Sequence, residues 1–262
     1  MNGYRKEEEV FFLSETAVGY NNAVALLKLR NAIRSSCKEE EVEKKRIIYS
    51  NKVVDDISII VTKYLPKKSE FWKLFTRKAL LDMQYYNFTS QPSVNRKSIK
   101  MSDYFIDASE DKLRCCENID LATHTLNVIK EYDEVYINYK YTTHIDGFLI
   151  VMACLLHDYG KSIKLTVEKL GNIDKKSKFG HEYYSAIYIN NLITEVQKTI
   201  TKESSNIDDI FHFDMSNANL VKNAVKDHHL KVVEEGSLAN ILKDIDGAAR
   251  KREYQNYIEK RG

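Results

Sequence analysis

The sequence predicts an all-α fold, and three observations support this. The chain of 262 residues contains only 2 prolines and 9 glycines, so long stretches lack residues that end helices. Apolar residues recur at helical spacing in several of these stretches. The composition, with 43% hydrophobic and 30% charged residues, is that of a soluble globular protein.

The first part of the chain predicts three helices. Residues 10–35 and 41–64 each show an amphipathic pattern, and Pro66 ends the second of them. A third helix is expected over residues 69–84, with Ser69 as its N-cap. The polar stretch that follows contains Pro92 and suits a linker.

This linker places a domain boundary near residues 88–103. We therefore expect an N-terminal helical, basic region of residues 1–95 and a second domain of residues 96–262. Charge supports the division, because residues 1–100 carry 19 Lys and Arg against 12 Asp and Glu, whereas the remainder carries 21 against 26.

The densest basic stretch is residues 63–78, in which Phe71, Trp72 and Phe75 are interleaved with lysines. Such a mixture can bind nucleic acid through phosphate contacts and stacking on bases. It equally suits a helix that buries its aromatic side chains and leaves its lysines in water. The sequence leaves both interpretations open.

The second part of the chain predicts five helices, most of which carry histidines. They are expected at residues 119–132, 145–156, from 180 onward, at 217–229 and from 237 to the C-terminus. Five of the seven histidines fall at inward or terminal positions of these helices. They are His124, His157, His181, His228 and His229.

The helix at residues 145–156 is apolar on all sides, which is typical of a buried helix. It ends at His157 and Asp158, followed by Tyr159, Gly160 and Lys161. A charged side chain in the interior is costly unless a partner satisfies it. Imidazole and carboxylate groups together suit borderline divalent metals, so the sequence predicts a metal site here.

These residues, in this order, resemble the HD-domain superfamily of metal-dependent phosphohydrolases. The resemblance covers about residues 101–255. It is carried by His124, the pair His157-Asp158 with the Gly-Lys that follows, His181, the pair His228-His229 and an aspartate in the last helix.

The resemblance implies an HD-type helical bundle with one metal ion held by His124, His157, Asp158 and Asp246. The extra histidines are similar to those of binuclear members, in which the aspartate of the HD pair bridges to a second ion. The implied ligands of that ion are His181 and His228, with His229 as a ligand or a donor behind one, and Asp120 as a further acidic ligand in some multinuclear members.

The aspartate of the last helix requires a choice between two residues. Asp244 and Asp246 point about 200° apart on a helix, so only one can face the site. We expect Asp246, because its small, apolar neighbours resemble the family's usual context, while Lys243 beside Asp244 suits a solvent-facing position.

The implied function is hydrolysis of a phosphoester, nucleotide or nucleic-acid-derived, by a metal-activated water. Asp158 and Lys161 would be catalytic, and Lys161 and Arg250 would bind the phosphate of a nucleotide or another phosphorylated small molecule. Lys161 is also explained as a cation that a helix C-terminus favours. The expected cofactors are two divalent ions of Mn, Fe, Ni, Co or Zn, with Mg as a further option.

Two alternatives share this helical bundle. In the first, the basic N-terminal part binds nucleic acid and the protein is a nuclease or relaxase-like HD protein. In the second, the richer ligand set holds two irons in an HD-type oxygenase. No apolar run reaches the roughly 18 residues of a membrane span, and no signal peptide is evident, so we expect a cytoplasmic protein without membrane contact.

Overall fold

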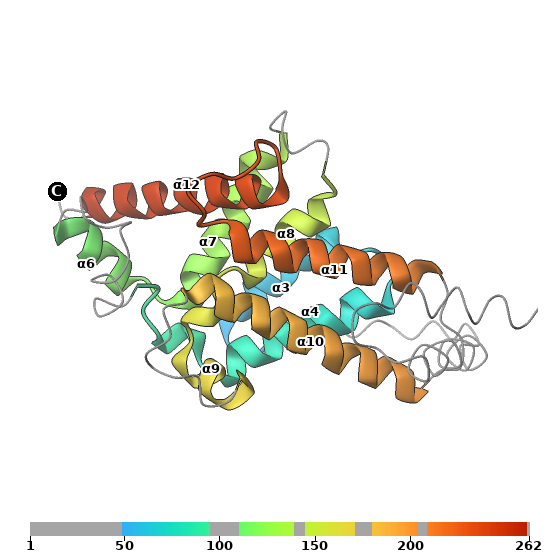
Figure 1. The fold of residues 1–262 in the computed structure, drawn as a ribbon. Helices are drawn as coiled ribbons and strands as arrows, with labels where there is room; N and C mark the ends of the chain where they lie inside the picture. The colour runs from blue at the N-terminus through green and yellow to red at the C-terminus, as the bar shows by residue number, and fades with distance from the viewer. Residues whose placement is uncertain (1–48, 95–109, 139–144, 171–179, 204–208, 261–262) are drawn as a thin grey trace, which may run out of the picture.

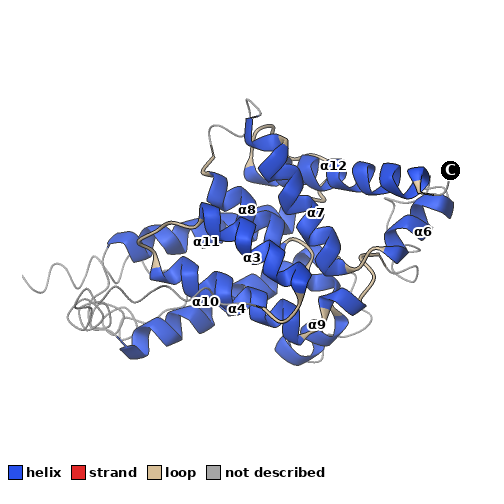
Figure 2. Cartoon of the chain, turned by 180° about the vertical axis from the view of Figure 1, so that it is seen from behind, coloured by secondary structure: helices blue, strands red, loops and turns tan. Residues whose placement is uncertain are grey.

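All regular secondary structure that the structure describes is helical. The computed structural model describes residues 49–94, 110–138, 145–170, 180–203 and 209–260. Within these ranges it has nine α-helices and no β-strand (Figure 1; Figure 2), which confirms the all-α fold class. The α-helices are α3 (Lys52–Tyr64), α4 (Glu70–Tyr85), α6 (Glu110–Asn118), α7 (Leu121–Glu134), α8 (Gly147–Leu156), α9 (Ile163–Leu170), α10 (His181–Glu203), α11 (Asp209–Asp227) and α12 (Leu238–Glu259). The 3-10 helices are η1 (Phe88–Ser90), η3 (Tyr136–Asn138) and η5 (Tyr159–Lys161).

Capping side chains set the starts of α3 and α4. The side chain of Asn51 accepts hydrogen bonds from two backbone N–H groups of the first turn, so α3 begins at Lys52. The predicted helix 41–64 included residues 49–51, which are not helical in the structure. Residues 41–48 and the predicted helix 10–35 lie outside the described residues. Ser69 caps α4 by accepting from the backbone of Trp72, as predicted.

The helices that carry the histidines are present as predicted, with one shifted start. Helix α11 begins at Asp209, earlier than the expected residue 217. The sequence did not predict α6 or α9. Helix α9 has only 8 residues, and α6 is mostly polar, so neither gives a long apolar repeat.

Helix α8 forms the centre of the core. Its residues from Leu149 to Leu156 are all buried, as the unbroken apolar run requires. Helices α3, α7, α11 and α12 pack around it. Figure 1 shows α8 in the middle of the molecule, between α7 and α11. The end of α8 is consequently surrounded by protein.

Helices α3 and α4 belong to the same hydrophobic core as the histidine-bearing helices. The core cluster joins Ile57 and Val61 of α3 to residues of α7, α8, α10, α11 and α12. The predicted division into residues 1–95 and 96–262 stays a prediction, because 1–48 and 95–109 lie outside the described residues. None of the described helices is long and apolar enough to cross a membrane.

The aromatic side chains of the basic stretch 63–78 lie in the core. Phe71, Trp72 and Phe75 are at most 2% exposed, so they are not accessible for stacking on a nucleic-acid base. Three lysines of the stretch have acidic neighbours: Lys63 lies 3.0 Å from Asp133, Lys73 lies 2.6 Å from Glu70, and Lys78 lies 3.7 Å from Glu195.

The segment that follows η1 is fastened to the start of α7. The backbone N–H of Ser93 donates to the carbonyl of Ile119, and that of Leu121 donates to the carbonyl of Gln91, both at 2.8 Å. The side chain of Ser93 donates to the carbonyl of Cys116 at 2.9 Å. These contacts place the buried Ser93 beside the end of α6 and the start of α7.

Candidate metal centre

The candidate centre is built at the end of α8. His157 follows the last residue of this helix, and His157 and Asp158 are 0% and 1% exposed. The next residue, Tyr159, anchors the turn, because its buried ring stacks on Tyr188 and its hydroxyl donates to the carbonyl of Ala79. The apolar helix thus brings an imidazole and a carboxylate into the interior.

Gly160 allows α10 to lie directly against this turn. Its N–H donates to Ser185 Oγ at 2.8 Å, and that hydroxyl donates to the carbonyl of His157 at 2.7 Å. A Cβ atom at position 160 would overlap the backbone oxygen of His181 and lie 2.7 Å from the backbone nitrogen of Ser185. Only glycine fits, and the close approach brings His181, the first residue of α10, to Asp158.

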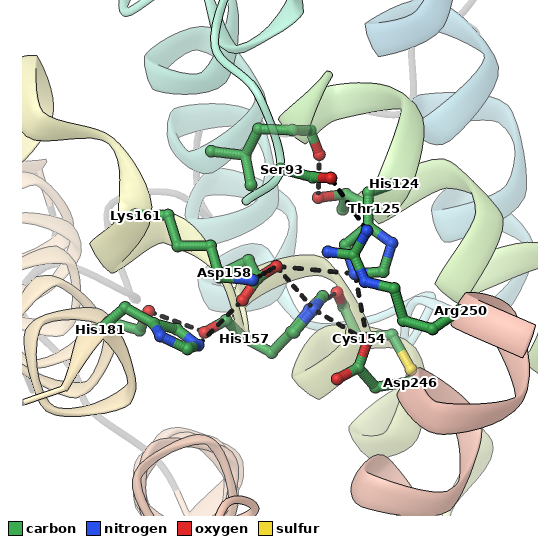
Figure 3. Close-up of polar contacts among 12 residues, drawn as sticks. Ser93, His124, Thr125, Cys154, His157, Asp158, Lys161, His181, Asp246 and Arg250 are labelled. Atoms are coloured by element: carbon green, nitrogen blue, oxygen red, sulfur yellow. Dashed lines mark hydrogen bonds and ion pairs between the residues drawn. The ribbon is translucent and has the colours of Figure 1, made fainter. Parts of the chain in front are cut away.

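One group of candidate ligands consists of His124, His157 and Asp158, and Asp246 adjoins them (Figure 3). Asp158 Oδ2 lies 3.2 Å from His157 Nε2 and 3.6 Å from His124 Nε2. Asp246 Oδ1 lies 3.1 Å from His124 Nε2 and 3.9 Å from His157 Nε2. Four side chains from α7, the end of α8 and α12 therefore converge on one point.

The second group consists of His181, His228 and His229, from α10 and the end of α11. One ring nitrogen of each lies within 4.8 Å of the others, and the Nε2 atoms of His181 and His229 are 3.1 Å apart. Asp158 links the two groups, because its other oxygen, Oδ1, lies 3.2 Å from His181 Nε2.

Contacts at the opposite ring nitrogen orient three of the histidines. The Nδ1 atom of His157 lies 2.8 Å from the carbonyl oxygen of Cys154, and that of His228 lies 2.6 Å from the carbonyl oxygen of Val225. A carbonyl oxygen only accepts, so Nδ1 carries the hydrogen and Nε2 presents a lone pair. His124 uses Glu253 instead, with 2.9 Å between Nδ1 and Oε1.

Three inward-facing atoms of the centre lack a hydrogen-bond partner within the described part of the chain. Among the described residues, Nε2 of His157 and Nε2 of His228 are buried without a hydrogen-bond partner, and so is Oδ1 of Asp158. Buried polar atoms are rarely left unsatisfied unless an ion or water completes them. Neutral imidazoles with an outer N–H fixed and an inner lone pair exposed are the form in which histidine binds metal. The residues present therefore fit a metal centre.

The protonation states of the candidate ligands suit metal binding. Burial raises the pKa of Asp158, but the charges of His157 and Lys161 together lower it well below its ordinary value. Burial and the neighbouring His229 lower the pKa of His228 well below its ordinary value. Burial and the charge of His181 lower the pKa of His229 to about 4. Near neutral pH the carboxylate is ionised and these two imidazoles are neutral.

The two predicted phosphate-binding cations lie on different sides of the centre (Figure 3). Lys161 Nζ lies 2.7 Å from Asp158 Oδ2, and its side chain is 22% exposed. Arg250 is held in place by two hydrogen bonds, because Nη1 donates to Ser93 Oγ at 2.9 Å and to Glu253 Oε2 at 3.0 Å. The two side chains are similarly exposed, at 22% and 19%, and Lys161 is the cation in contact with the bridging carboxylate.

Of the three aspartates that the sequence analysis named as possible further ligands, only Asp246 faces the site. Asp246 faces the candidate ligands, whereas Asp244 is exposed. Asp120 is the N-cap of α7, and its two oxygens accept hydrogen bonds from the backbone N–H and the hydroxyl of Thr123, at 2.8 and 2.7 Å. This capping role explains its place one turn before His124.

Sequence reasoning missed the residues that support the ligands, namely Ser93, Asn127, Ser185 and Glu253. Glu253 gave a usable signal, because Asp246, Arg250 and Glu253 follow one another at helical spacing on one face of α12. Ser93 and Asn127 gave none, since their contacts join segments that are far apart in the sequence.

Comparisons with models of protein families, with curated proteins and with solved structures find no match for this chain. The chain is therefore characterised by its all-helical fold and by buried histidine and aspartate groups that could hold metal ions.

Proposed function

We propose that this protein is a metal-dependent phosphohydrolase of the HD type, cleaving a phosphoester of a nucleotide or another phosphorylated small molecule. The observation that carries the proposal is the position of Asp158. Its two oxygens lie 3.2 Å from the Nε2 atoms of His157 and His181, which belong to different ligand groups. A carboxylate between two ligand groups is suited to bridge a pair of ions.

The residues that would hold the ions differ between the two groups. His124, His157 and Asp246 would hold one ion and the second histidine group the other, with Asp158 shared. Nitrogen and carboxylate donors favour Mn, Fe, Co, Ni or Zn, whereas Mg prefers oxygen ligands alone. Ions bound here would supply an acidified water and offset the negative charge of a phosphoryl group.

The chain's own residues would position the substrate beside these ions. The side chains of Lys161 and His181, which contact Asp158, are 22% and 26% exposed, so solvent reaches this part of the centre. Lys161 would exchange its contact with Asp158 for a phosphoryl oxygen of the substrate. Arg250 would contribute positive charge, with Nη1 bound to Ser93 and Glu253 and its buried Nη2 without a hydrogen-bond partner among the described residues.

The test is metal analysis followed by an activity screen. Purified protein should contain about two equivalents of transition metal, and after reconstitution with Mn²⁺ it should hydrolyse p-nitrophenyl esters of phosphate or free nucleotides. His157→Ala should lose both metal and turnover. A wild-type protein that takes up no ion after exposure to Mn²⁺, Fe²⁺ and Zn²⁺ would refute the proposal.

The same experiment separates the two alternatives. A di-iron oxygenase has the same type of ligands, and it would show iron content, oxygen consumption and no activity with Mn²⁺. Nucleic-acid binding through residues 63–78 would rest on lysine contacts to phosphates, because the aromatic side chains are buried. Such binding would weaken steeply with added salt. Turnover of free nucleotides would not require nucleic-acid binding.

A further inference from the structure

Glu253 of α12 lies directly behind His124. Its Oε1 atom is 2.9 Å from Nδ1 of His124, and its side chain is 3% exposed. On the other edge of the same ring, Nε2 is 3.1 Å from Asp246 Oδ1. The two nitrogen atoms of an imidazole point in diverging directions, so Glu253 cannot share an ion with Asp246.

Glu253 is itself held at both oxygens. Asn127 Nδ2 donates to Oε1 at 2.8 Å, and Arg250 Nη1 donates to Oε2 at 3.0 Å. The same Arg250 nitrogen donates to Ser93 Oγ, which ties α12 to the segment before α7. The carboxylate therefore has a fixed position, and it presents a fixed acceptor to His124.

This contact distinguishes His124 from His157, His181 and His228. His157 and His228 donate from Nδ1 to backbone carbonyls, which are neutral acceptors. At His181, Glu182 Oε2 lies 3.7 Å from Nδ1, which is too long for a hydrogen bond, and both side chains are partly exposed. A buried carboxylate behind a histidine makes the ring a stronger metal ligand than a carbonyl does.

We infer that Glu253 is a positioning residue, which fixes the orientation of His124 and strengthens the binding of the ion held by His124, His157, Asp158 and Asp246. Arg250 and Asn127 keep Glu253 in place for this purpose. The inference rests on the proposed metal-dependent function and adds a role for a side chain outside the ligand groups. It also assigns Arg250 a part in metal binding that needs no substrate.

The test compares Co²⁺ affinity of the full chain, measured by competition with a chromophoric chelator, between wild type and Glu253→Gln. This substitution keeps the size of the side chain and removes its charge. The tighter Co²⁺ site should weaken about 10–100-fold, with a change in the Co²⁺ absorption bands. Asn127→Ala should weaken it in the same direction by less, because the charge stays.

The matched control is Glu131→Gln. Glu131 is also a buried glutamate between α7 and α12, 4% exposed and paired with Arg252 at 2.9 Å, but it contacts none of the candidate ligands. It should lose stability without losing Co²⁺ affinity. Both variants are checked for folding by circular dichroism and denaturation, and Asn127→Ala carries the test if Glu253→Gln does not fold.

The outcomes separate this inference from the proposed function. Unchanged Co²⁺ affinity in Glu253→Gln overturns the role of Glu253 but leaves the metal centre in place. If that variant does not fold, unchanged affinity in Asn127→Ala has the same meaning. An equal loss of affinity in Glu131→Gln also overturns the role of Glu253. A wild-type protein that binds no Co²⁺ overturns both. Selective loss in Glu253→Gln supports the inference even if no substrate has been found.

Discussion

Asp158 Oδ1 and His181 Nε2 lie 3.2 Å apart, and this contact joins two ligand groups that come from opposite sides of the site. Asp158 follows the buried helix α8, whereas His181 begins α10. The contact depends on the close approach of α10 at Gly160, where no side chain fits. One carboxylate can therefore serve both groups, and several predictions test this arrangement.

Asp158→Asn should abolish metal binding at both groups, because it keeps the shape of the side chain and removes the shared negative charge. Hydrolysis should fall by more than about 100-fold, since partners behind metal ligands are already worth about 10–100-fold. Plasma mass spectrometry and turnover measure the effect. The control is Asp244→Asn, whose parent side chain is exposed, and it should keep metal and activity. Full metal content in Asp158→Asn would show that this carboxylate is no ligand.

Metal ions should stabilise the folded protein. An ion at about 100 times its dissociation constant adds about 2.7 kcal/mol, provided that it does not bind the unfolded chain. For a chain of this size that corresponds to a rise in Tm of roughly 5–10 °C. Differential scanning fluorimetry with Mn²⁺ or Zn²⁺ measures it. His157→Ala should show no such rise, and equal rises in both proteins would point to binding elsewhere.

The sequence predicted the parts of this protein that local patterns determine. The apolar run that becomes α8, and the histidine and aspartate after it, are adjacent in the chain, so their burial follows from one helix. Helical periodicity predicted that only one of Asp244 and Asp246 faces the site. The choice of Asp246 came from its small, apolar neighbours, which resemble the context in HD-domain proteins, and from Lys243 beside Asp244.

Other features depend on contacts between distant segments, which periodicity does not encode. Glu253 meets His124 only because α12 crosses α7, and Ser93 reaches Arg250 across more than half of the chain. Asp120 has the spacing of a ligand on a helix, but its side chain caps the helix start instead. The start of α11 was missed because its first residues alternate polar and apolar types without a clear helical face.

The metal-free protein should lose stability as the pH falls from about 6.5 towards about 4. Burial and neighbouring imidazoles lower the pKa of His228, and they lower the pKa of His229 to about 4 from the unfolded value of 6.5. Between these values the unfolded chain binds more protons, so acid favours unfolding. His157 opposes this, because Asp158 and Asp246 raise its pKa although burial lowers it.

Urea denaturation of chelator-treated protein across this pH range measures the effect. His229→Gln removes one of the two groups with a lowered pKa, so its stability should depend less steeply on pH than that of wild type. The pKa of His157 is shifted in the opposite direction, so the difference in slope between wild type and variant is the quantity to compare. It measures the contribution of His229 together with its effect on the pKa of His228. A variant with the same slope as wild type would show that His229 titrates normally.

Two glycine substitutions should have opposite effects on stability. Gly160→Ala places a Cβ against the backbone of His181 and Ser185, which cannot move without shifting α10. Overpacking of this kind costs about 1–3 kcal/mol or more. Because His181 shifts with α10, this variant should also lose metal from the second histidine group.

Gly247→Ala is the matched control, since it lies within α12 beside Asp246 and a Cβ there meets no atom within 4 Å. It should raise stability by about 0.5–1 kcal/mol and leave metal content unchanged. Chemical denaturation and metal analysis of both variants decide the point: a Gly160→Ala protein as stable and as metal-rich as wild type would mean that the tight contact between η5 and α10 does not position His181.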